Sequence, residues 1–365
     1  MSFRVLQTSK KSKARLSRLT TNHGTLTGPF FMTIATRGAV RNVHTDELRT
    51  LGVPIVLANT YHLLLRPGDA QLERAGGLHT FMGWRGPILT DSGGYQVFSL
   101  SQHRKITEHG VTFRDPSGGK QYVLTPESAI DTQYAIGSDI MMVLDECPPY
   151  PCDHAYAQQS LERTTRWAQR CFAHHKARGS KQKLFGIVQG STFKDLRIAS
   201  AQQIAGIAFD GYAVGGVAVG EPKKAMRDVL RWTVPHLPSN RPRYLMGVGR
   251  PDDIVMAVKH GIDMFDCVIP TREARHGRLY LWKGDKPKIT SGASFYKTIS
   301  ITNTRFAHDH KKITKGALRG ITFAYLHHLF KTNEGLGLRL ASLHNIEFYQ
   351  QLMRTVQGAI RNKQL

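Results

Sequence analysis

Cysteine is scarce in this chain: 365 residues contain four cysteines, and no two of them form a CxxC pair. The sequence therefore offers no basis for a disulfide framework or a cysteine-rich metal site. Long apolar runs are missing as well. No window approaches the length of a membrane span, and the basic first residues are not followed by an apolar stretch. We expect a soluble cytoplasmic protein with no membrane partner.

Acidic residues are also few. Lys and Arg number 50 and Asp and Glu 27, which gives a formal net charge of +23. The basic excess is clustered, because residues 283–331 contain ten Lys or Arg and only two Asp. Clustering predicts a polyanionic partner and favours nucleic acid, whereas a solvated, solubilising basic surface is the alternative.

Short apolar strands alternate with amphipathic helices along most of the chain. Helices predicted at residues 125–136, 154–177 and 193–205 lie between strands, and Thr125 and Asp153 are suitable N-caps. This alternation predicts a parallel α/β sheet, and eight strands would close it into a (β/α)8 TIM barrel; a doubly wound sheet is the alternative. The predicted strands are 30–36, 55–59, 88–91, 139–145, 184–189, 209–215, 244–249 and 264–269.

Three segments fall outside this repeat. Residues 14–30 alternate around Asn22-His23-Gly24 and predict an N-terminal hairpin. Residues 102–124 predict a second, hairpin-like insertion, and residues 276–332 predict a basic, β-like one. We expect one domain over residues 1–365, with 276–332 as an inserted basic subdomain and 336–362 as the last barrel helix.

The predicted strands end on polar residues or glycines. In a parallel barrel all carboxyl ends open on the same mouth, where active sites lie, so these residues should share one pocket. They are Asn59, Asp91, Asp145, Gln189, Gly215, Gly216, Gly247 and Asp266.

Asp266 is the acid around which the function can be argued, because it interrupts an apolar run that leads into a basic loop. A structural carboxylate paired with Arg272 or Arg275 is the simplest interpretation. Several acids at one mouth instead favour glycosidic chemistry, in which one carboxylate attacks an anomeric carbon and another serves as acid and base. A metal site fits less well, since no His accompanies these acids.

Six motifs resemble those of a known family. They are DSGGYQVFSL (91–100), LDECPPY (144–150), GIVQG (186–190), AVGGVAVGE (213–221), YLMGVGRPDD (244–253) and MFDCVIPTREARHG (264–277). From about Phe3 to its C-terminus the chain resembles the tRNA-guanine transglycosylases, also called queuine tRNA-ribosyltransferases.

The resemblance implies a barrel enzyme, a pentosyltransferase of queuosine biosynthesis. Such enzymes replace the wobble guanine of tRNAs with GUN anticodons (Asp, Asn, His and Tyr) by a 7-deazaguanine. Asp266 would be the nucleophile on ribose C1′ and would form a covalent enzyme–tRNA intermediate. Asp91 would be the general base that handles the N9 proton, and two displacements would retain the configuration at C1′.

Base recognition is implied by motif position. Asp145 and Gln189 would bond the edge of the base, Gly216 would offer its backbone N–H, and Tyr95 and Met246 would sandwich the ring. The whole implied base site comprises Ser92, Tyr95, Asp145, Cys147, Gln189, Gly215, Gly216, Val217 and Met246.

Three positions bear on which base is used. Cys147 and Val219 match the bacterial members, which use 7-aminomethyl-7-deazaguanine (preQ1), rather than the eukaryotic members, which use queuine and carry smaller residues. The backbone at Val217 would face the aminomethyl group. Guanine and preQ1 are therefore the implied small-molecule partners.

The resemblance also implies tRNA contacts beside the nucleophile. Arg272 and Arg275 would contact the neighbouring uridine and the RNA backbone, and the phosphate contacts should depend on salt. The full set is Gly247, Val248, Gly249, Arg250, Pro251, Asp252, Asp253, Thr271, Arg272, Glu273, Ala274 and Arg275.

The chain departs from the family at a metal site. Family members hold a structural zinc with a CxCxxC triplet and a later His, and these positions are Ile313, Lys315, Leu318 and His344 here. Because thiolates make such a site tight, we predict no zinc and no other cofactor, with packing in place of the metal. The remaining histidines of this region could form another metal site, although their spacing is more typical of surface or RNA-facing residues. They are His308, His310, His327 and His328.

Two alternatives to a preQ1 enzyme remain: a catalytically impaired tRNA-binding homologue that lost its zinc site, and an exchanger that uses queuine. The presence of both Asp91 and Asp266 argues against the first. Bacterial relatives pair through the zinc-bearing region, so the resemblance implies a homodimer.

Overall fold

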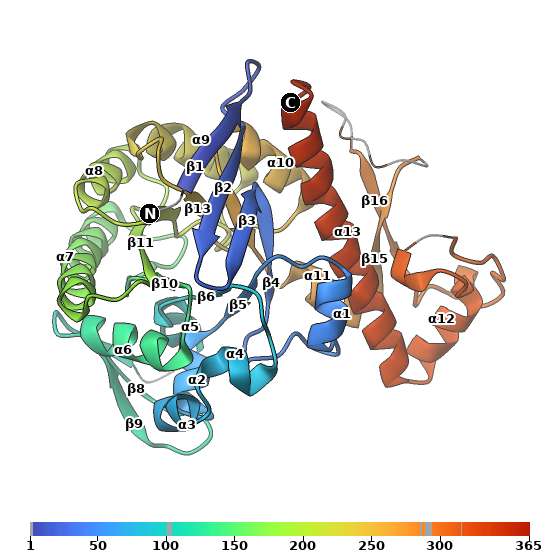
Figure 1. Cartoon of the computed structure of the whole chain (residues 1–365), viewed down its shortest axis with the longest axis horizontal. Helices are drawn as coiled ribbons and strands as arrows, with labels where there is room; N and C mark the ends of the chain where they lie inside the picture. The colour runs from blue at the N-terminus through green and yellow to red at the C-terminus, as the bar shows by residue number, and fades with distance from the viewer. Residues whose placement is uncertain (1–2, 101–103, 285–286, 288, 290–293, 315) are drawn as a thin grey trace.

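The fold is described from a computed structural model, which covers residues 3–100, 104–284, 287, 289, 294–314 and 316–365, without the side chains of residues 99 and 100. Eight parallel strands form a closed barrel at its centre (Figure 1). Every predicted barrel strand is present, and the doubly wound alternative is wrong because the last strand, β14, pairs with the first, β4. In order around the barrel the strands are β4 (Phe30–Ile34), β5 (Val56–Ala58), β6 (Ile88–Thr90), β10 (Ile140–Met142), β11 (Lys183–Val188), β12 (Gly211–Val214), β13 (Arg243–Leu245) and β14 (Met264–Asp266).

Glycine does not weaken β12, because the strand needs the space that a missing side chain leaves. A Cβ on Gly211 would lie 2.4 Å from the buried Phe185 ring of β11, and a Cβ on Gly186 would lie 2.5 Å from Phe209. The two rings thus pack directly against the neighbouring backbone.

Helices surround the barrel. The cap residues Thr125 and Asp153 accept N–H bonds at the starts of α6 and α7, as predicted. The helices are α1 (Thr45–Thr50), α2 (Thr60–Leu65), α3 (Asp69–Arg74), α4 (Gly77–Met82), α5 (Gly94–Leu100), α6 (Pro126–Ile136), α7 (His154–Arg178), α8 (Lys194–Ala205), α9 (Lys223–Thr233), η1 (Val234–His236), α10 (Pro251–Lys259) and α11 (Ile269–Arg275). No helix of the described residues combines the length and apolar character needed to cross a membrane.

The prediction around residue 270 is wrong in detail. The strand stops at Asp266, and the segment predicted as a basic loop forms helix α11. Pro270 belongs to the first turn of this helix, where its missing N–H costs no hydrogen bond. Arg272 and Arg275 therefore stand on a helix that starts directly beside Asp266.

A three-stranded antiparallel sheet covers the N-terminal end of the barrel. The predicted hairpin is present as β2 (Arg15–Thr21) and β3 (Gly24–Gly28), and β1 (Phe3–Thr8) adds a strand that was not predicted. Arg15 connects the sheet to the barrel through a buried ion pair with Asp263, the residue directly before β14.

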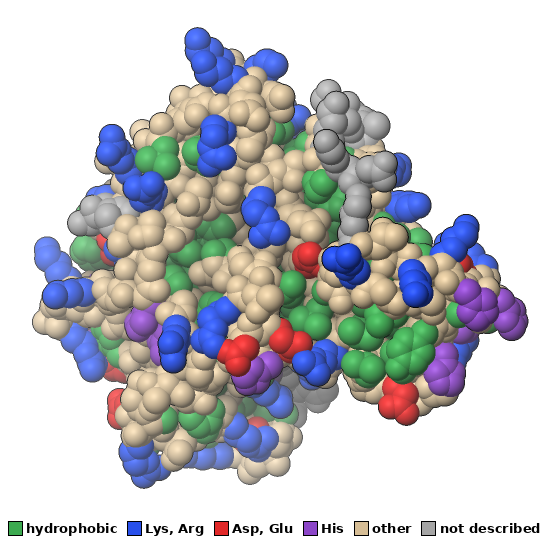
Figure 2. All heavy atoms as spheres, turned by 45° about the vertical axis from the view of Figure 1, so that its right-hand side comes forward, with side chains coloured by type: hydrophobic (Ala, Val, Ile, Leu, Met, Phe, Trp, Pro, Cys, Tyr) green, Lys and Arg blue, Asp and Glu red, His purple; other side chains and the backbone are tan. Residues whose placement is uncertain are grey.

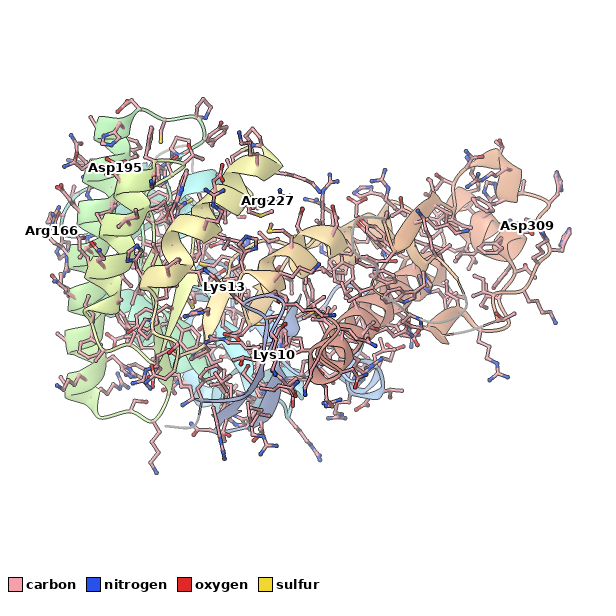
Figure 3. The ribbon with its side chains drawn as sticks, turned by 90° about the horizontal axis from the view of Figure 1, so that it is seen from above. Lys10, Lys13, Arg166, Asp195, Arg227 and Asp309 are labelled. Carbon is pink, nitrogen blue, oxygen red and sulfur yellow. The ribbon has the colours of Figure 1, made fainter. Side chains whose placement is uncertain are left out.

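Two insertions decorate the barrel. The first is a three-stranded antiparallel sheet of β7 (Arg104–Ile106), β8 (Val111–Arg114) and β9 (Gln121–Leu124). The second projects away from the barrel, with Asp309 at its far side (Figure 3). It is only partly β-structure, so the β-like prediction is wrong for its second half. It contains the ribbon of β15 (Arg278–Trp282) and β16 (Tyr296–Ser300), the turns η2 (Thr304–Phe306) and η3 (Gly316–Leu318), and helix α12 (Phe323–Lys331).

The last helix, α13 (Gly335–Arg361), joins the two parts of the molecule. It packs against β4 and α11 on the barrel side and against β15 and α12 on the other side. Gln357 also donates hydrogen bonds to the carbonyls of Thr27 and Pro29, both at 2.9 Å. The long helix thus fixes the inserted part relative to the barrel mouth.

Candidate active site

The strand ends do converge, because the barrel is closed and all its strands run parallel. Asp91 directly follows β6, Gln189 follows β11, and Gly215 follows β12, while Asp266 is the last residue of β14. Asp145 lies three residues beyond the end of β10.

Asp91 is held by four donors. Its carboxylate accepts from the backbone N–H groups of Thr60 (3.0 Å) and Gly93 (3.1 Å) and from the side-chain amides of Asn59 (2.5 Å) and Gln96 (3.1 Å). Burial raises the pKa of this carboxyl to about 7, and the nearby charge of Asp266 raises it further, although the hydrogen bonds lower it. Asp91 can therefore both hold and release a proton near neutral pH.

Asp266 is held differently. Its Oδ1 accepts from the Tyr244 hydroxyl at 2.5 Å and from the Gly247 N–H at 2.7 Å. Burial raises the pKa of Asp266, and these two donors oppose the rise. No ion pair among the described residues involves Asp266, so the structural pairing with Arg272 or Arg275 is absent there. The carboxylate keeps Oδ2 available at the mouth.

Asp145 and its partners form a third polar group. Its two carboxylate oxygens accept from the Ser92 hydroxyl at 3.2 Å and from the Gln189 amide at 2.7 Å. Burial raises the pKa of Asp145 to about 6. The amide oxygen of Gln189 is buried and has no partner among the described residues. The group thus presents acceptors to a ligand.

The remaining predicted base-site residues frame these acids. Tyr95 is 49% exposed on α5, Met246 is half-buried just after β13, and Val217 is buried. Burial, followed by the charge of Asp145, raises the pKa of the Cys147 thiol to about 12. Cys147 is therefore a neutral lining residue and not a nucleophile.

The predicted tRNA-contacting residues divide by exposure. Val248, Gly249, Pro251, Thr271 and Ala274 are buried, so they shape the backbone beneath the surface. The exposed members are Gly247, Arg250, Asp252 and Arg272.

Arginines gather beside this surface. Burial lowers the pKa of Arg275, and the neighbouring positive charges of Arg41 and Arg272 lower it further. Such mutual repulsion is relieved by a bound anion, which is consistent with an RNA backbone.

Some site residues were missed by sequence reasoning. Asn59 was expected at the mouth from its strand end, but its hydrogen bond to Asp91 was not. Tyr244 lies inside β13 and Arg197 inside α8, where no local pattern separates a polar partner from a packing residue. The partner of Tyr244 lies on β14, and those of Arg197 lie at the end of β11 and in the loops after β11 and β12, so only the folded barrel reveals them.

The residues at the family's zinc positions do not fit the metal. Leu318 is 0% exposed and packs with the partly buried Ile313 in an apolar cluster with Leu326, Leu329 and Ala341. Lys315 lies outside the described residues. The Nε2 of His344 lies 2.8 Å from the Tyr280 carbonyl oxygen, and neither Ile nor Leu offers a ligand atom.

One other group of possible metal ligands occurs among the described residues: His23, His79 and Asp139, at the opposite end of the barrel. The two rings are stacked, with centroids 3.7 Å apart and planes at 19°. A metal ion lies in the plane of each ligating imidazole, so nearly parallel stacked rings cannot aim at one ion. The group is better explained as a polar tie from the hairpin to the barrel. His327, one of the alternative ligands, is buried with Nδ1 2.7 Å from the Ile301 carbonyl oxygen.

Comparisons with known proteins agree with this geometry. The sequence profile of the family described as queuine tRNA-ribosyltransferase matches residues 9–365. A protein of that name from Symbiobacterium thermophilum is 49% identical over 362 residues, which cover 98% of this chain and 87% of the relative. Proteins of the same name from Halalkalibacterium halodurans (47%, covering 100% of this chain and 94% of the relative) and Listeria monocytogenes (46%, covering 100% and 93%) are also similar.

Proposed function

The chain belongs to the queuine tRNA-ribosyltransferase family, and we propose from this that it exchanges the wobble guanine of GUN-anticodon tRNAs for preQ1. The observation that carries the proposal is the pair Asp91 and Asp266 at one mouth, each held by its own donors and with pKa values raised by burial. The enzyme is a glycosyltransferase, and its retained carboxylates do not favour an idle tRNA-binding homologue.

In the first displacement, the Asp266 carboxylate attacks ribose C1′ as the C1′–N9 bond breaks. Neutral Asp91 gives its proton to the departing guanine and becomes a carboxylate. In the second, the incoming base loses its N9 proton to Asp91, N9 attacks C1′, and the bond from C1′ to Asp266 breaks. No proton or energy source is consumed overall.

The base site is assigned by chemistry. A carboxylate only accepts hydrogen bonds, so Asp145 would face the N1–H and amino donors of the guanine edge. Ser92 and Gln189 hold Asp145 in place for this contact. Tyr95 and Met246 would cover the ring faces, and Cys147 and Val217 would line the position of the aminomethyl group. Guanine, preQ1 and tRNA are thus the proposed partners.

We propose that the protein works without the family's zinc. The apolar packing of Leu318 and Ile313 occupies the region that a metal would organise. We also propose a single domain in which 276–332 is an inserted subdomain and 336–362 is the last barrel helix, located in the cytoplasm.

A homodimer is proposed as well. Tyr325 on α12 and Leu336 at the start of α13 are 45% and 42% exposed. Figure 2, which brings this side of the molecule forward, shows apolar side chains gathered on this lobe among Lys and Arg side chains. An exposed apolar patch of this kind is typical of a protein interface.

The deciding experiment is incorporation of labelled guanine into a GUN-anticodon tRNA by the wild type and by Asp266→Ala, with metal analysis of the same preparation. Incorporation that the substitution abolishes, in a zinc-free protein, supports both proposals. Tight tRNA binding without incorporation by the wild type would contradict the transglycosylase proposal. A matched comparison of guanine, preQ1 and queuine as incoming bases tests the choice of substrate.

A further inference from the structure

Arg197 is a fully buried cation under the base site. Its side chain is 0% exposed, and no described carboxylate forms an ion pair with it. The guanidinium donates to four backbone carbonyls instead. Nε donates to Ser191 (2.6 Å), Nη1 to Val188 (3.1 Å) and Gly215 (2.8 Å), and Nη2 to Gly216 (3.1 Å). These charge-assisted bonds offset the cost of burying the charge.

The four carbonyls belong to two separate loops. Val188 is the last residue of β11 and Ser191 follows the strand, so the two flank Gln189, while Gly215 and Gly216 follow β12. The planar guanidinium reaches both loops at once, which a single ammonium could not do in the same geometry. Arg197 therefore connects the two loops that carry the proposed base-reading groups.

The carbonyl contacts also fix where the N–H groups point. In a planar trans peptide the N–H of one residue points opposite to the C=O of the residue before it. Since the carbonyls of Gly215 and Gly216 point at Arg197, the N–H groups of Gly216 and Val217 point away from it. Neither N–H donates to another backbone group in the described part of the chain.

Gln189 lies against the same peptides. A Cβ on Gly216 would come within 2.4 Å of its amide oxygen, so Gly216 must lack a side chain for this approach. Gln189 thus lies between the Gly216 peptide and the carboxylate of Asp145, to which its amide is bonded. Among the described residues the N–H groups of Gly216 and Val217 donate to no protein acceptor. A guanine edge offers N1–H and an amino group as donors and O6 as the adjacent acceptor. If Asp145 accepts hydrogen bonds from N1–H and the amino group, O6 is left to accept from the N–H groups of Gly216 and Val217.

We propose that Arg197 is a positioning residue that determines base specificity. By holding the carbonyls of Gly215 and Gly216, it keeps the next two N–H groups turned toward the base, so that the site selects an acceptor at C6 of the ring. This inference rests on the proposed function, because it takes a guanine-type base as the ligand.

The test compares guanine with 6-thioguanine, which keeps N1–H and the amino group but replaces O6 by a weaker sulfur acceptor. Binding of both bases is measured by calorimetry, and exchange into tRNA is measured in parallel. For the wild type we expect a preference for guanine of about tenfold. In Arg197→Met we expect guanine affinity to fall by about tenfold and the preference to fall toward one, with the KM for tRNA changed less than about twofold.

Arg243→Met is the matched control, since Arg243 is another buried arginine that donates to a carbonyl, that of Leu237, at the opposite end of the barrel. It should lose stability and keep the base preference. If Arg197→Met does not fold, Arg197→Lys replaces it, and a reduced preference is again expected because an ammonium cannot reach both loops.

The outcomes separate the two proposals. A wild type that binds guanine selectively through Arg197 but does not modify tRNA would contradict the proposed function and support the positioning role. A wild type that exchanges guanine, with an unchanged base preference in both Arg197 variants, would overturn the positioning role alone. Equal losses of base preference in the Arg197 and Arg243 variants would also overturn it, because they would indicate only general destabilisation.

Discussion

At the scale of single residues, two aspartates at one mouth are made different by their donors. Asp91 accepts from two backbone N–H groups and two side-chain amides, whereas Asp266 accepts from one hydroxyl and one N–H. The second oxygen of Asp266 is left for the substrate, while Asp91 is held on both oxygens. This difference suits a nucleophile and a proton carrier.

The pKa of Asp91, raised to about 7 by burial, predicts opposite pH trends for the two half-reactions. Departure of guanine needs the protonated carboxyl and should slow as pH rises through about 7. Capture of the incoming base needs the carboxylate and should speed up over the same range. Single-turnover experiments on tRNA and on the isolated intermediate would show this, and Asp91→Asn should remove both dependences. A common trend for both steps would contradict the assignment.

Tyr244 should tune the nucleophile. Its hydroxyl bond lowers the pKa of Asp266, so Tyr244→Phe should let that pKa rise and move the acid limb of intermediate formation to higher pH. We expect the rate at neutral pH to fall about tenfold with the guanine KM unchanged. Tyr212→Phe is the control, because the Tyr212 hydroxyl donates to the Ile207 carbonyl. A similar loss in both variants would show that Tyr244 acts only through packing.

The acids of the site could be predicted from sequence because each one lies at or within three residues of the end of a buried strand, and the barrel brings all strand ends together. Tyr244 and Arg197 could not, since each depends on a partner on another element. Their roles follow from strand register and loop conformation, which no local pattern encodes.

At the scale of elements, the inserted lobe should be held together by packing. Leu318→Ala removes a fully buried side chain and should lower the free energy of unfolding by about 2–5 kcal/mol. Denaturant titrations of wild type and variant, each with and without a chelator, would measure this. The chelator should change neither curve; a wild type destabilised by it would contradict the zinc-free proposal.

Asp139 joins three elements at the closed end of the barrel. It accepts from the N–H groups of His23 (3.1 Å) and Ile88 (2.9 Å) and lies 2.9 Å from the His23 ring. Burial by itself would raise the pKa of Asp139, but the bonds from His79, Ile88 and His23 outweigh it and lower the pKa.

A lowered folded-state pKa stabilises the fold above the unfolded value, about 4, and this stabilisation disappears as pH falls through the folded value. Asp139→Asn should therefore be less stable than wild type at neutral pH, with a smaller difference below pH about 4. Thermal unfolding across this range is the measurement. A stability difference between wild type and Asp139→Asn that does not change with pH would mean that the shape of the Asp139 side chain, and not its charge, stabilises this contact.

The barrel strands were predictable because they are short, apolar and buried on both faces. The secondary-structure predictions were wrong where an apolar segment forms a helix instead of a strand. Ile269 and Pro270 look like a strand end but form the first turn of α11. Residues 323–331 form helix α12, which packs its apolar face into the same cluster as Leu279 of β15. Strand β1 was missed because only its pairing with β2 makes it a strand.

At the scale of the whole molecule, the net charge of +23 should govern tRNA binding and not base binding. Raising the salt concentration should increase the KM for tRNA steeply and leave the KM for guanine nearly unchanged. Arg272→Ala should reduce the slope of log affinity against log salt by about 1. Lys10→Ala serves as the control, because Lys10 lies between β1 and β2 of the sheet that covers the N-terminal end of the barrel. Equal slopes of log affinity against log salt for wild type, Arg272→Ala and Lys10→Ala would mean that tRNA does not bind at Arg272.

Closure of the barrel has a consequence for the protein during its own synthesis. Asp266 lies opposite Met32, so β14 pairs with β4, a strand that left the ribosome long before it. Helix α13, which is made last, packs on that same early strand. A nascent chain can expose its basic segments to RNA, but its two aspartates cannot meet until almost the whole polypeptide has emerged. A chain that ends before β14 lacks Asp266 and the closed barrel, so the proposed chemistry requires a nearly complete polypeptide.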